Sequence, residues 1–266
     1  MEPARATRIG VIGGAGWLGG AIAAAILKAG ITPPENLALS YRSKKPDRFG
    51  SAFWTTDNQA LADCSDIIIV SIRPEDWPPL CVDAKGKLVI SVMAGIRLFD
   101  LCRHHRTQRA VRSLPNGAAE VCKSYTPWTA TAEVDDEERA LVRAIFDACG
   151  QQDEVPTESE IDYFTGLTGS GPAFPALLAQ AMMTHALAKG LDRNVARRAV
   201  NTVLVGAGSL LELRDECPFD TVQTFRNYQG TTAAAIETMV TAGFSEAVAK
   251  GLTAAFEKSV EMGETT

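Results

Sequence analysis

The chain has 266 residues, of which 46% are hydrophobic and 22% are charged, and its formal net charge is −6. This length allows one large domain or two smaller ones, each with its own hydrophobic core. The acidic balance argues against nucleic acid as a general partner, and the longest apolar runs, such as Ile67–Val70, are far too short to cross a bilayer.

Short apolar runs alternate with helical segments over the first 156 residues. Strands are expected at Arg8–Ile12, Leu37–Tyr41, Ile67–Ile72, Leu88–Val92, Ala110–Val111 and Tyr125–Thr131. The Ala-rich segment Gly16–Ala29 is expected to be a helix that Gly30 ends, and Asp135 is expected to cap a helix through Phe146. Alternating strands and helices imply an α/β domain with a parallel, doubly wound sheet.

The pattern changes near Pro156, and almost no strand signal remains from Glu158 onward. Helices are expected at Pro172–Lys189, from Asp192 to about Leu213, from Thr231 or Thr232 to about Gly243, and from Ser245 to about Met262. These helices are apolar around much of their circumference, so each must be buried on more than one face. We therefore expect these helices to form a subunit interface. The change of pattern divides the chain into an α/β domain, 1–156, and an all-α domain, 157–266.

The segment Gly14-Ala15-Gly16-Trp17-Leu18-Gly19 follows the first strand and opens a helix. This is the G-x-G-x-x-G motif in the context that a Rossmann-like dinucleotide-binding domain requires. Gly14 is expected to allow the tight turn, Gly16 to let the backbone approach a pyrophosphate, and Gly19 to let the helix pack close to the strand. The helix amides, among them those of Trp17 and Leu18, would meet the phosphate charge. The alternative is a Gly-rich turn that binds nothing.

The end of the second strand, Ser40–Lys45, predicts which dinucleotide is bound. A site that prefers NAD would place Asp or Glu here to bind the ribose 2′-hydroxyl. The segment instead offers cations and a hydroxyl donor in Arg42, Ser43 and Lys44, which suit a 2′-phosphate. We therefore predict NADP(H) as the cofactor; the alternative is that Lys44 and Lys45 are merely solvated.

Several later segments carry the motifs of one enzyme family. They are Ile72-Arg73-Pro74, Ser91–Gly95, Arg112-Ser113-Leu114-Pro115-Asn116, Glu158–Asp162, Gly169–Phe174 and Gly230-Thr231-Thr232. In these segments the chain resembles the pyrroline-5-carboxylate reductases over nearly its whole length. The resemblance implies hydride transfer from NADPH to a cyclic imine carboxylate, which gives proline. It also implies a homodimer within a larger ring of dimers.

The resemblance also implies further positions near the cofactor. Ile72, Arg73 and Pro74 are expected to line the nicotinamide and ribose region, with Asn58 and Ala94 as further neighbours. The three histidines, His104, His105 and His185, fall in none of the matching motifs, so a surface or packing role is expected for them.

The Gly230-Thr231-Thr232 segment is the expected substrate loop. A cyclic imine is partly protonated near neutral pH, so position and charge complementarity matter more than a strong general acid. At a helix start the amides of Gly230 and Thr231 can hold a carboxylate, and the Thr232 hydroxyl can hydrogen-bond the ring nitrogen and relay a proton to it. An ordinary threonine N-cap is the alternative.

The residues before these threonines depart from the family. Where the family has serine-proline-glycine-glycine, this chain has Asn227-Tyr228-Gln229-Gly230. Larger side chains thus stand at a tight, bare turn, and Asn227 and Tyr228 are expected to contact the substrate. Three functions stay open: a reductase of the proline pathway, a reductase of another imine or small carbonyl acid, and an NADP-binding sensor without catalysis.

The cysteines indicate the expected compartment. All six are widely spaced and form no C-x-x-C pair, so no zinc or redox motif is predicted and we expect buried free thiols. The first strand begins near Arg8, which leaves no room for a signal peptide. We expect a cytoplasmic enzyme without a metal, whose partners are a small-molecule substrate and a second copy of the chain.

Overall fold

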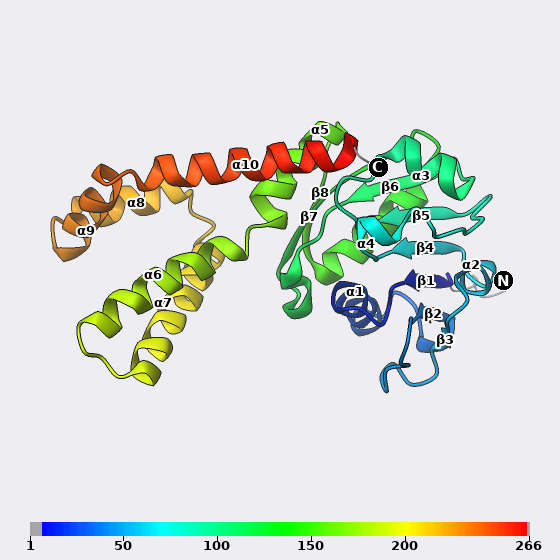
Figure 1. Ribbon diagram of the computed structural model, residues 1–266, viewed down its shortest axis with the longest axis horizontal. Coiled ribbons are helices and arrows are strands. Elements are labelled where there is room, and N and C mark those ends of the chain that lie inside the picture. Colours follow the sequence, from blue (N-terminus) through cyan, green and yellow to red (C-terminus); the bar gives the residue numbers. More distant parts are fainter. Residues whose placement is uncertain (1–6, 265–266) are drawn as a thin grey trace. The chain divides into compact units, whose positions relative to one another are not determined.

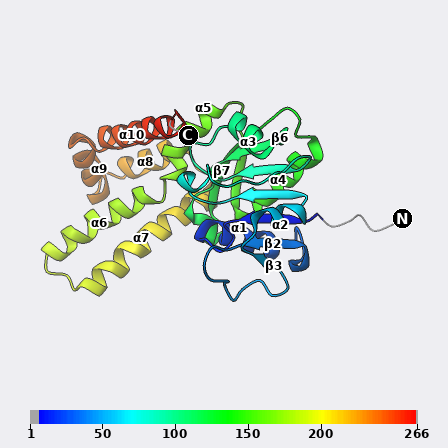
Figure 2. The same cartoon turned by 45° about the vertical axis from the view of Figure 1, so that its right-hand side comes forward.

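The computed structural model describes residues 7–264. The chain forms two compact units. Residues up to Ser170, together with those from Ala254 onward, make the first unit, and Gly171–Thr253 make the second. The first unit carries the labelled strands in Figures 1 and 2, and the second consists of helices.

The first unit is built on an eight-stranded sheet of order β3-β2-β1-β4-β5-β6-β7-β8. The strands are β1 (Ile9–Ile12), β2 (Leu37–Ser40), β3 (Phe53–Thr55), β4 (Ile67–Val70), β5 (Leu88–Ser91), β6 (Arg109–Ser113), β7 (Ser124–Ala130) and β8 (Gly150–Glu154). The first six strands in this order, β3, β2, β1, β4, β5 and β6, pair in parallel, as expected. Strand β7 is antiparallel to β6 and parallel to β8. The order of this sheet and its covering helices confirm the Rossmann-like α/β prediction.

Two strands were not expected from the sequence. The edge strand β3 has only three residues, and β8 is the polar segment Gly150-Gln-Gln-Asp-Glu, which is mostly exposed. Neither carries the apolar periodicity from which a buried strand is predicted. Their place in the sheet comes from backbone pairing with β2 and β7.

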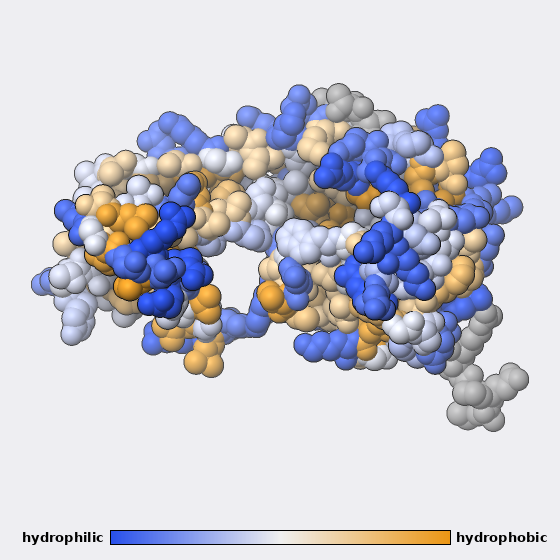
Figure 3. All heavy atoms as spheres, turned by 60° about the horizontal axis from the view of Figure 1, so that its bottom comes forward, coloured by the Kyte–Doolittle hydropathy of each residue, from blue (hydrophilic) through white to orange (hydrophobic). Residues whose placement is uncertain are grey.

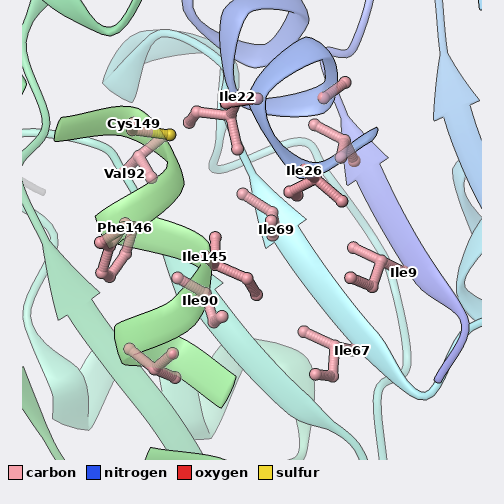
Figure 4. Close-up of a cluster of buried hydrophobic side chains, with 14 of the residues drawn as sticks. Ile9, Ile22, Ile26, Ile67, Ile69, Ile90, Val92, Ile145, Phe146 and Cys149 are labelled. Atoms are coloured by element: carbon pink, nitrogen blue, oxygen red, sulfur yellow. The ribbon is translucent and has the colours of Figure 1, made fainter. Parts of the chain in front are cut away.

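Helices cover both faces of the sheet, which is why strands β1, β2, β4 and β5 are buried at every residue. On one face, Ile9, Ile67 and Ile69 pack against α1 (Trp17–Lys28) and α4 (Asp136–Cys149). Figure 4 shows this layer, with Ile22 and Ile26 of α1 and Ile145 and Phe146 of α4 pointing toward the strands. The alternate strand residues point to the opposite face, where Ile12, Ile68 and Val70 pack with α2 (Asn58–Asp63) and α3 (Leu98–His105).

Local capping explains where two of the expected helices begin. The Asp135 side chain accepts a hydrogen bond from the Glu138 amide at 2.8 Å, and Glu138 reaches back to the Asp135 amide, which completes a capping box at α4. Asp192 likewise accepts from two first-turn amides of α7 (Arg193–Arg214). Both predicted caps are confirmed.

The second unit contains α6 (Ala173–Ala188), α7, α8 (Pro218–Asn227), α9 (Thr231–Thr241) and the first part of α10 (Phe244–Glu264). Helices α6 and α7 lie side by side (Figures 1 and 2). The threonine caps expected for α9 are wrong, because Gly230 is the N-cap and Thr231 is already helical. Ser245 also lies inside α10, which begins at Phe244, and α8 was not expected.

The described cysteines are all free, but most are not buried. Cys149, at the end of α4, is fully buried, and burial raises the pKa of its thiol to about 12. Cys81 and Cys217 are exposed because both lie in connections between elements rather than on a core-facing helix or strand. The expectation of six buried thiols is therefore wrong.

His105 lies buried at the end of α3, and both of its ring nitrogens form hydrogen bonds. Its Nε2 accepts a hydrogen bond from Trp77 Nε1 at 3.0 Å, and its Nδ1 lies 3.1 Å from the Val82 carbonyl oxygen, to which it donates. Both bonds can form only with a neutral ring that carries its proton on Nδ1. His105 therefore has the packing role expected from the sequence.

We expect the protein to lose stability as the pH falls below about 6.5, the ordinary pKa of histidine. Burial is the largest cause that lowers the pKa of His105 in the folded chain. The unfolded chain then binds a proton that the folded chain does not, so stability is lost between this pH and the lower folded pKa. One such proton changes the free energy of unfolding by at most about 1.4 kcal/mol per pH unit. Melting temperatures measured between about pH 7 and pH 5 check this.

The control for this prediction compares two histidines. His105→Asn removes the buried titrating ring, so we expect a flatter dependence of the melting temperature on pH. His185→Asn changes an exposed residue of α6 and should leave the slope as it is. An unchanged slope in His105→Asn would contradict the assignment.

Candidate functional site

A glycine turn joins β1 to α1. Gly13 adopts φ +81°, and a Cβ there would lie 2.1 Å from the Ser71 carbonyl oxygen, so only glycine fits. The tight turn was expected at Gly14, and this is corrected to Gly13, the extra glycine of the loop. At Gly19 a Cβ would lie 2.5 Å from the Gly13 carbonyl oxygen, so the helix packs directly on the glycine turn, whereas the sequence predicted a close approach of the helix to the strand.

The turn presents the start of α1 as an anion site. Gly16 is the N-cap, and the amides of Trp17, Leu18 and Gly19 are the first-turn donors that no earlier helical carbonyl can satisfy. Ser40, at the end of β2, fixes the turn from the side: its hydroxyl accepts from the Gly13 amide at 2.9 Å, and its carbonyl accepts from Ala15 at 3.0 Å. Such a helix start suits a phosphate.

Arg48 is a cation beside this turn that the sequence analysis missed. Its Nη2 donates to the Gly14 carbonyl at 2.9 Å, and its guanidinium occupies the space where a Cβ of Gly20 would stand. The signal was present in Gly20, a glycine that the G-x-G-x-x-G motif does not require. Arg48 therefore fixes the carbonyl side of the turn and leaves the amide side of the helix free.

Trp17, the first residue of α1, has 66% of its surface exposed. Its Nε1 donates to Glu120 Oε2 at 2.8 Å, and its ring lies against Gly117 of the short helix η3 (Gly117–Val121). A cavity of about 450 Å³ opens beside Trp17, Arg48 and Glu120. A larger cavity of about 680 Å³ lies around Trp77 and His104, but it contains none of the residues expected to bind the cofactor.

The cationic segment after β2 is accessible. Arg42, Ser43 and Lys44 are exposed, and Arg42 Nη2 lies 2.8 Å from Asp76 Oδ2. Asn58, the first residue of α2, has a buried side-chain oxygen without a hydrogen-bond partner in the described part of the chain. An unsatisfied buried acceptor of this kind fits a ligand donor such as a ribose hydroxyl or an adenine amino group.

The remaining expected cofactor residues follow β4 and β5. Ile72 packs on the hydrophobic core, exposed Arg73 stands 3.7 Å from Glu75, and Pro74 begins the short helix η2 (Pro74–Asp76). Ala94 is half-buried after β5. Because β1, β2, β4 and β5 are parallel, the residues that follow them lie at one edge of the sheet. The structure thus brings the predicted cofactor residues to the edge where α/β sheets bind their ligands.

Two of the family-like motifs meet in an ion-pair cluster. Arg112, which is 2% exposed, contacts Glu158 at 3.1 Å and forms an ion pair with Asp162. Both acids lie on α5 (Glu158–Phe164), and Ser259 of α10 donates to Asp162 at 3.2 Å. Asn116 Nδ2 donates to the Thr168 carbonyl at 2.9 Å and holds the turn η4 (Thr165–Gly169). These motif residues fasten α5, η4 and the end of α10 to the sheet.

The expected substrate residues lie at the end of α8, in the short connection that follows it, and at the start of α9. Asn227 ends α8, Tyr228 is 88% exposed, and Gly230 caps α9 in an extended conformation. Thr231 and Thr232 are the first two helical residues, and both are exposed. The amides here belong to a helix start and can bind a carboxylate, with the threonine hydroxyls beside them.

Gln229 forms a left-handed backbone turn between α8 and α9. Its φ is +49°, in the left-handed region where a side chain costs about 1–2 kcal/mol. The backbone therefore turns tightly here although Tyr228 and Gln229 carry large side chains.

The sheet order, the glycine turn after β1 and the helix start that faces it define a dinucleotide-binding oxidoreductase-type domain, joined to a helical unit. Two family models match the chain. The NADP oxidoreductase coenzyme F420-dependent model covers residues 8–95, and the pyrroline-5-carboxylate reductase dimerisation model covers residues 158–262.

Relatives match the chain from end to end. A pyrroline-5-carboxylate reductase of Methanosarcina acetivorans is 32% identical, and the alignment covers 97% of this chain and 98% of that protein. The solved structure of the Coxiella burnetii pyrroline-5-carboxylate reductase matches with a TM-score of 0.88 and 26% identity, over 97% of this chain and 99% of that one. The Plasmodium falciparum pyrroline carboxylate reductase with NADP bound matches with a TM-score of 0.85 and 25% identity, over 98% and 100% of the two chains. This chain belongs to the pyrroline-5-carboxylate reductase family.

Between residues 7 and 264, no helix combines the length and the apolar character needed to span a membrane. No group of three or more His, Cys, Asp or Glu side chains in the same described residues is arranged to hold a metal ion.

Proposed function

We propose that this chain is an NADPH-dependent oxidoreductase that reduces 1-pyrroline-5-carboxylate to proline. The observation that carries this function is the combination, in one chain, of the dinucleotide turn after β1 with the Gly-Thr-Thr helix start of α9. The end-to-end similarity to pyrroline-5-carboxylate reductases supports reading the two features together.

The cofactor residues of the proposal all lie in the first unit. The amides at the start of α1 bind the pyrophosphate, the segment after β2 binds the 2′-phosphate, and the residues after β4 and β5 line the ribose and nicotinamide. They are Gly14, Gly16, Trp17, Leu18, Gly19, Arg42, Ser43, Lys44, Asn58, Ile72, Arg73, Pro74 and Ala94. When bound, NADPH supplies the hydride that the imine carbon accepts.

The substrate residues lie at the start of α9. The amides of Gly230 and Thr231 hold the substrate carboxylate, because both belong to the positive end of a helix dipole. The Thr232 hydroxyl hydrogen-bonds the ring nitrogen and passes a proton to it, and an exposed hydroxyl regains that proton from water. Asn227 and Tyr228 contact the rest of the ring.

Assays with the purified protein test the function. NADPH oxidation that depends on 1-pyrroline-5-carboxylate and yields proline is the expected result. Turnover of larger cyclic imines or of carbonyl acids alone would assign the enzyme to a different substrate. Tight NADPH binding without turnover of any of them would make the chain a cofactor-binding sensor.

Functional boundaries follow from the same proposal. Residues 1–156 form the NADP-binding domain, and residues 157–266 form the substrate and dimerisation domain. The dimerisation model that begins at residue 158 supports this division. The protein acts in the cytoplasm, where its six free cysteines suit a reducing environment.

The chain functions as a homodimer built by its helical unit, and dimers can assemble further into a ring. Helices α6, α8 and α9 contain no buried residue within the single chain, although they are rich in apolar side chains. Figure 3 shows hydrophobic side chains, in orange, over the surface of this unit. Exposed examples are Leu177, Val203, Val205, Leu213 and Phe219, at 55–85% of their surface. An apolar area of this kind marks an interface.

We therefore expect light scattering at low micromolar concentration to give the mass of a dimer, or a multiple of it, and no monomer. Val205→Lys places a charge on an apolar residue of α7 that is 70% exposed and should weaken the assembly. Phe99→Lys changes an equally exposed apolar residue of α3 in the first unit and should leave the mass unchanged. A folded wild-type monomer under these conditions would refute the dimer.

A further inference from the structure

The proposed 2′-phosphate ligand Arg42 already has an anionic partner in this chain. Its Nη2 lies 2.8 Å from Asp76 Oδ2. Arg42 follows β2, and Asp76 ends η2, which follows β4. Strands β2 and β4 both pair in parallel with β1 and flank it (Figure 1). The ion pair therefore joins the two strands on either side of the glycine turn, at the edge where the cofactor is proposed to bind.

The ion pair between Arg42 and Asp76 is weak enough for an anionic ligand to displace Asp76 from Arg42. The Arg42 side chain is 79% exposed and the Asp76 side chain is 34% exposed. Water screens such a pair, so its contribution to stability is small and Arg42 can exchange one anion for another. A phosphate is a stronger partner for a guanidinium than a single carboxylate, because it offers more acceptor oxygens and more charge.

Asp76 itself is held in place by its short helix. The Asp76 amide donates to the Arg73 carbonyl at 3.0 Å, and the next residue, Trp77, is buried in the core. These contacts fix the backbone of Asp76, so its carboxylate remains within reach of Arg42. A 2′-phosphate must draw Arg42 away from Asp76, whereas a 2′-hydroxyl needs no cation.

From this geometry we infer that Asp76 is a specificity-determining residue, whose carboxylate competes with the 2′-phosphate of NADPH for Arg42 and so limits the preference for NADPH over NADH. The inference rests on the proposed function in that the cofactor binds at this edge. It assigns Asp76 no contact with the substrate.

The experiment measures dissociation constants for NADPH and NADH by cofactor fluorescence, without substrate. Asp76→Asn keeps the shape of the side chain and removes its charge, so NADPH should bind about fivefold more tightly. Affinity for NADH should stay within about twofold. Glu75→Gln is the matched control, because it removes the neighbouring charge, which faces Arg73 instead, and it should leave the ratio of the two constants unchanged.

A double-mutant cycle decides whether Arg42 is the target of the competition. In an Arg42→Ala background, Asp76→Asn should no longer improve NADPH binding. An equal improvement in that background would overturn the inference, and so would weaker or unchanged NADPH binding in Asp76→Asn alone. These outcomes leave the proposed function intact as long as the wild-type protein binds NADPH. If the wild-type protein bound neither cofactor, the proposed function and the inference would both fail.

Discussion

Replacing Thr232 with Val should lower turnover of 1-pyrroline-5-carboxylate by about a hundredfold, the low end for the loss of a proton-transferring group. The substitution removes the hydroxyl and keeps the shape and the β-branching of the side chain. Thr232 is the second residue of α9 and is exposed, so the fold should not depend on its hydroxyl. NADPH affinity should barely change, because the proposed cofactor residues belong to the other unit.

The control for this prediction is a threonine further along the same helix. The Thr238 hydroxyl donates to the Ala234 carbonyl at 2.8 Å, and Thr238→Val should leave turnover unchanged. Steady-state rates measured with saturating NADPH compare the two variants.

Tyr228 offers a different outcome for the same loop. It is 88% exposed and immediately precedes the Gln229 turn, so its phenol can supply the polar contact to the substrate in place of Thr232. In that case Tyr228→Phe would be the damaging change and Thr232→Val would be nearly silent. If neither variant changed turnover, the placement of the substrate site at the start of α9 would be wrong.

Replacing Arg42 with Ala should weaken NADPH binding by about ten- to a hundredfold and leave NADH binding little changed. A hydrogen bond to a charged phosphate contributes about 1.5–3 kcal/mol, which corresponds to this range. NADH lacks the 2′-phosphate, so the loss should be specific to NADPH. Titration of both cofactors by fluorescence measures the two constants.

The control for Arg42 is another exposed arginine of the first unit. Arg103, on α3, is exposed and is not among the proposed cofactor residues, so Arg103→Ala should affect neither cofactor. Equal losses for NADPH and NADH in Arg42→Ala would show that Arg42 supports the loop rather than the phosphate.

The sequence predicted the elements whose side chains face the core. Strands β1, β4 and β5 are buried on both faces, so they read as short apolar runs, and the glycines after β1 mark the turn. The caps of α4 and α7 were predictable because they depend on residues within one turn of each other. The apolar residues around α6 likewise predict an interface from the sequence alone.

The sequence predicted less well the elements and turns whose positions depend on strand pairing or on close backbone packing. The polar strand β8 joins the sheet only because β7 lies beside it. The left-handed turn lies at Gly13 rather than Gly14, because the Ser71 carbonyl leaves no room for a Cβ there. Thr231 is helical rather than a cap, since the extended residue that starts α9 is Gly230.

By itself, the sequence determined the dinucleotide turn, the cationic segment after β2 and the family-like motifs, because each is a local run of residues. Tertiary structure alone decided which of these residues meet. It paired Arg42 with Asp76, 34 residues later in the chain, and Arg112 with Glu158, 46 residues later. Parallel strands bring the ends of distant segments to one edge of the sheet, and separation along the chain gives no sign of such contacts.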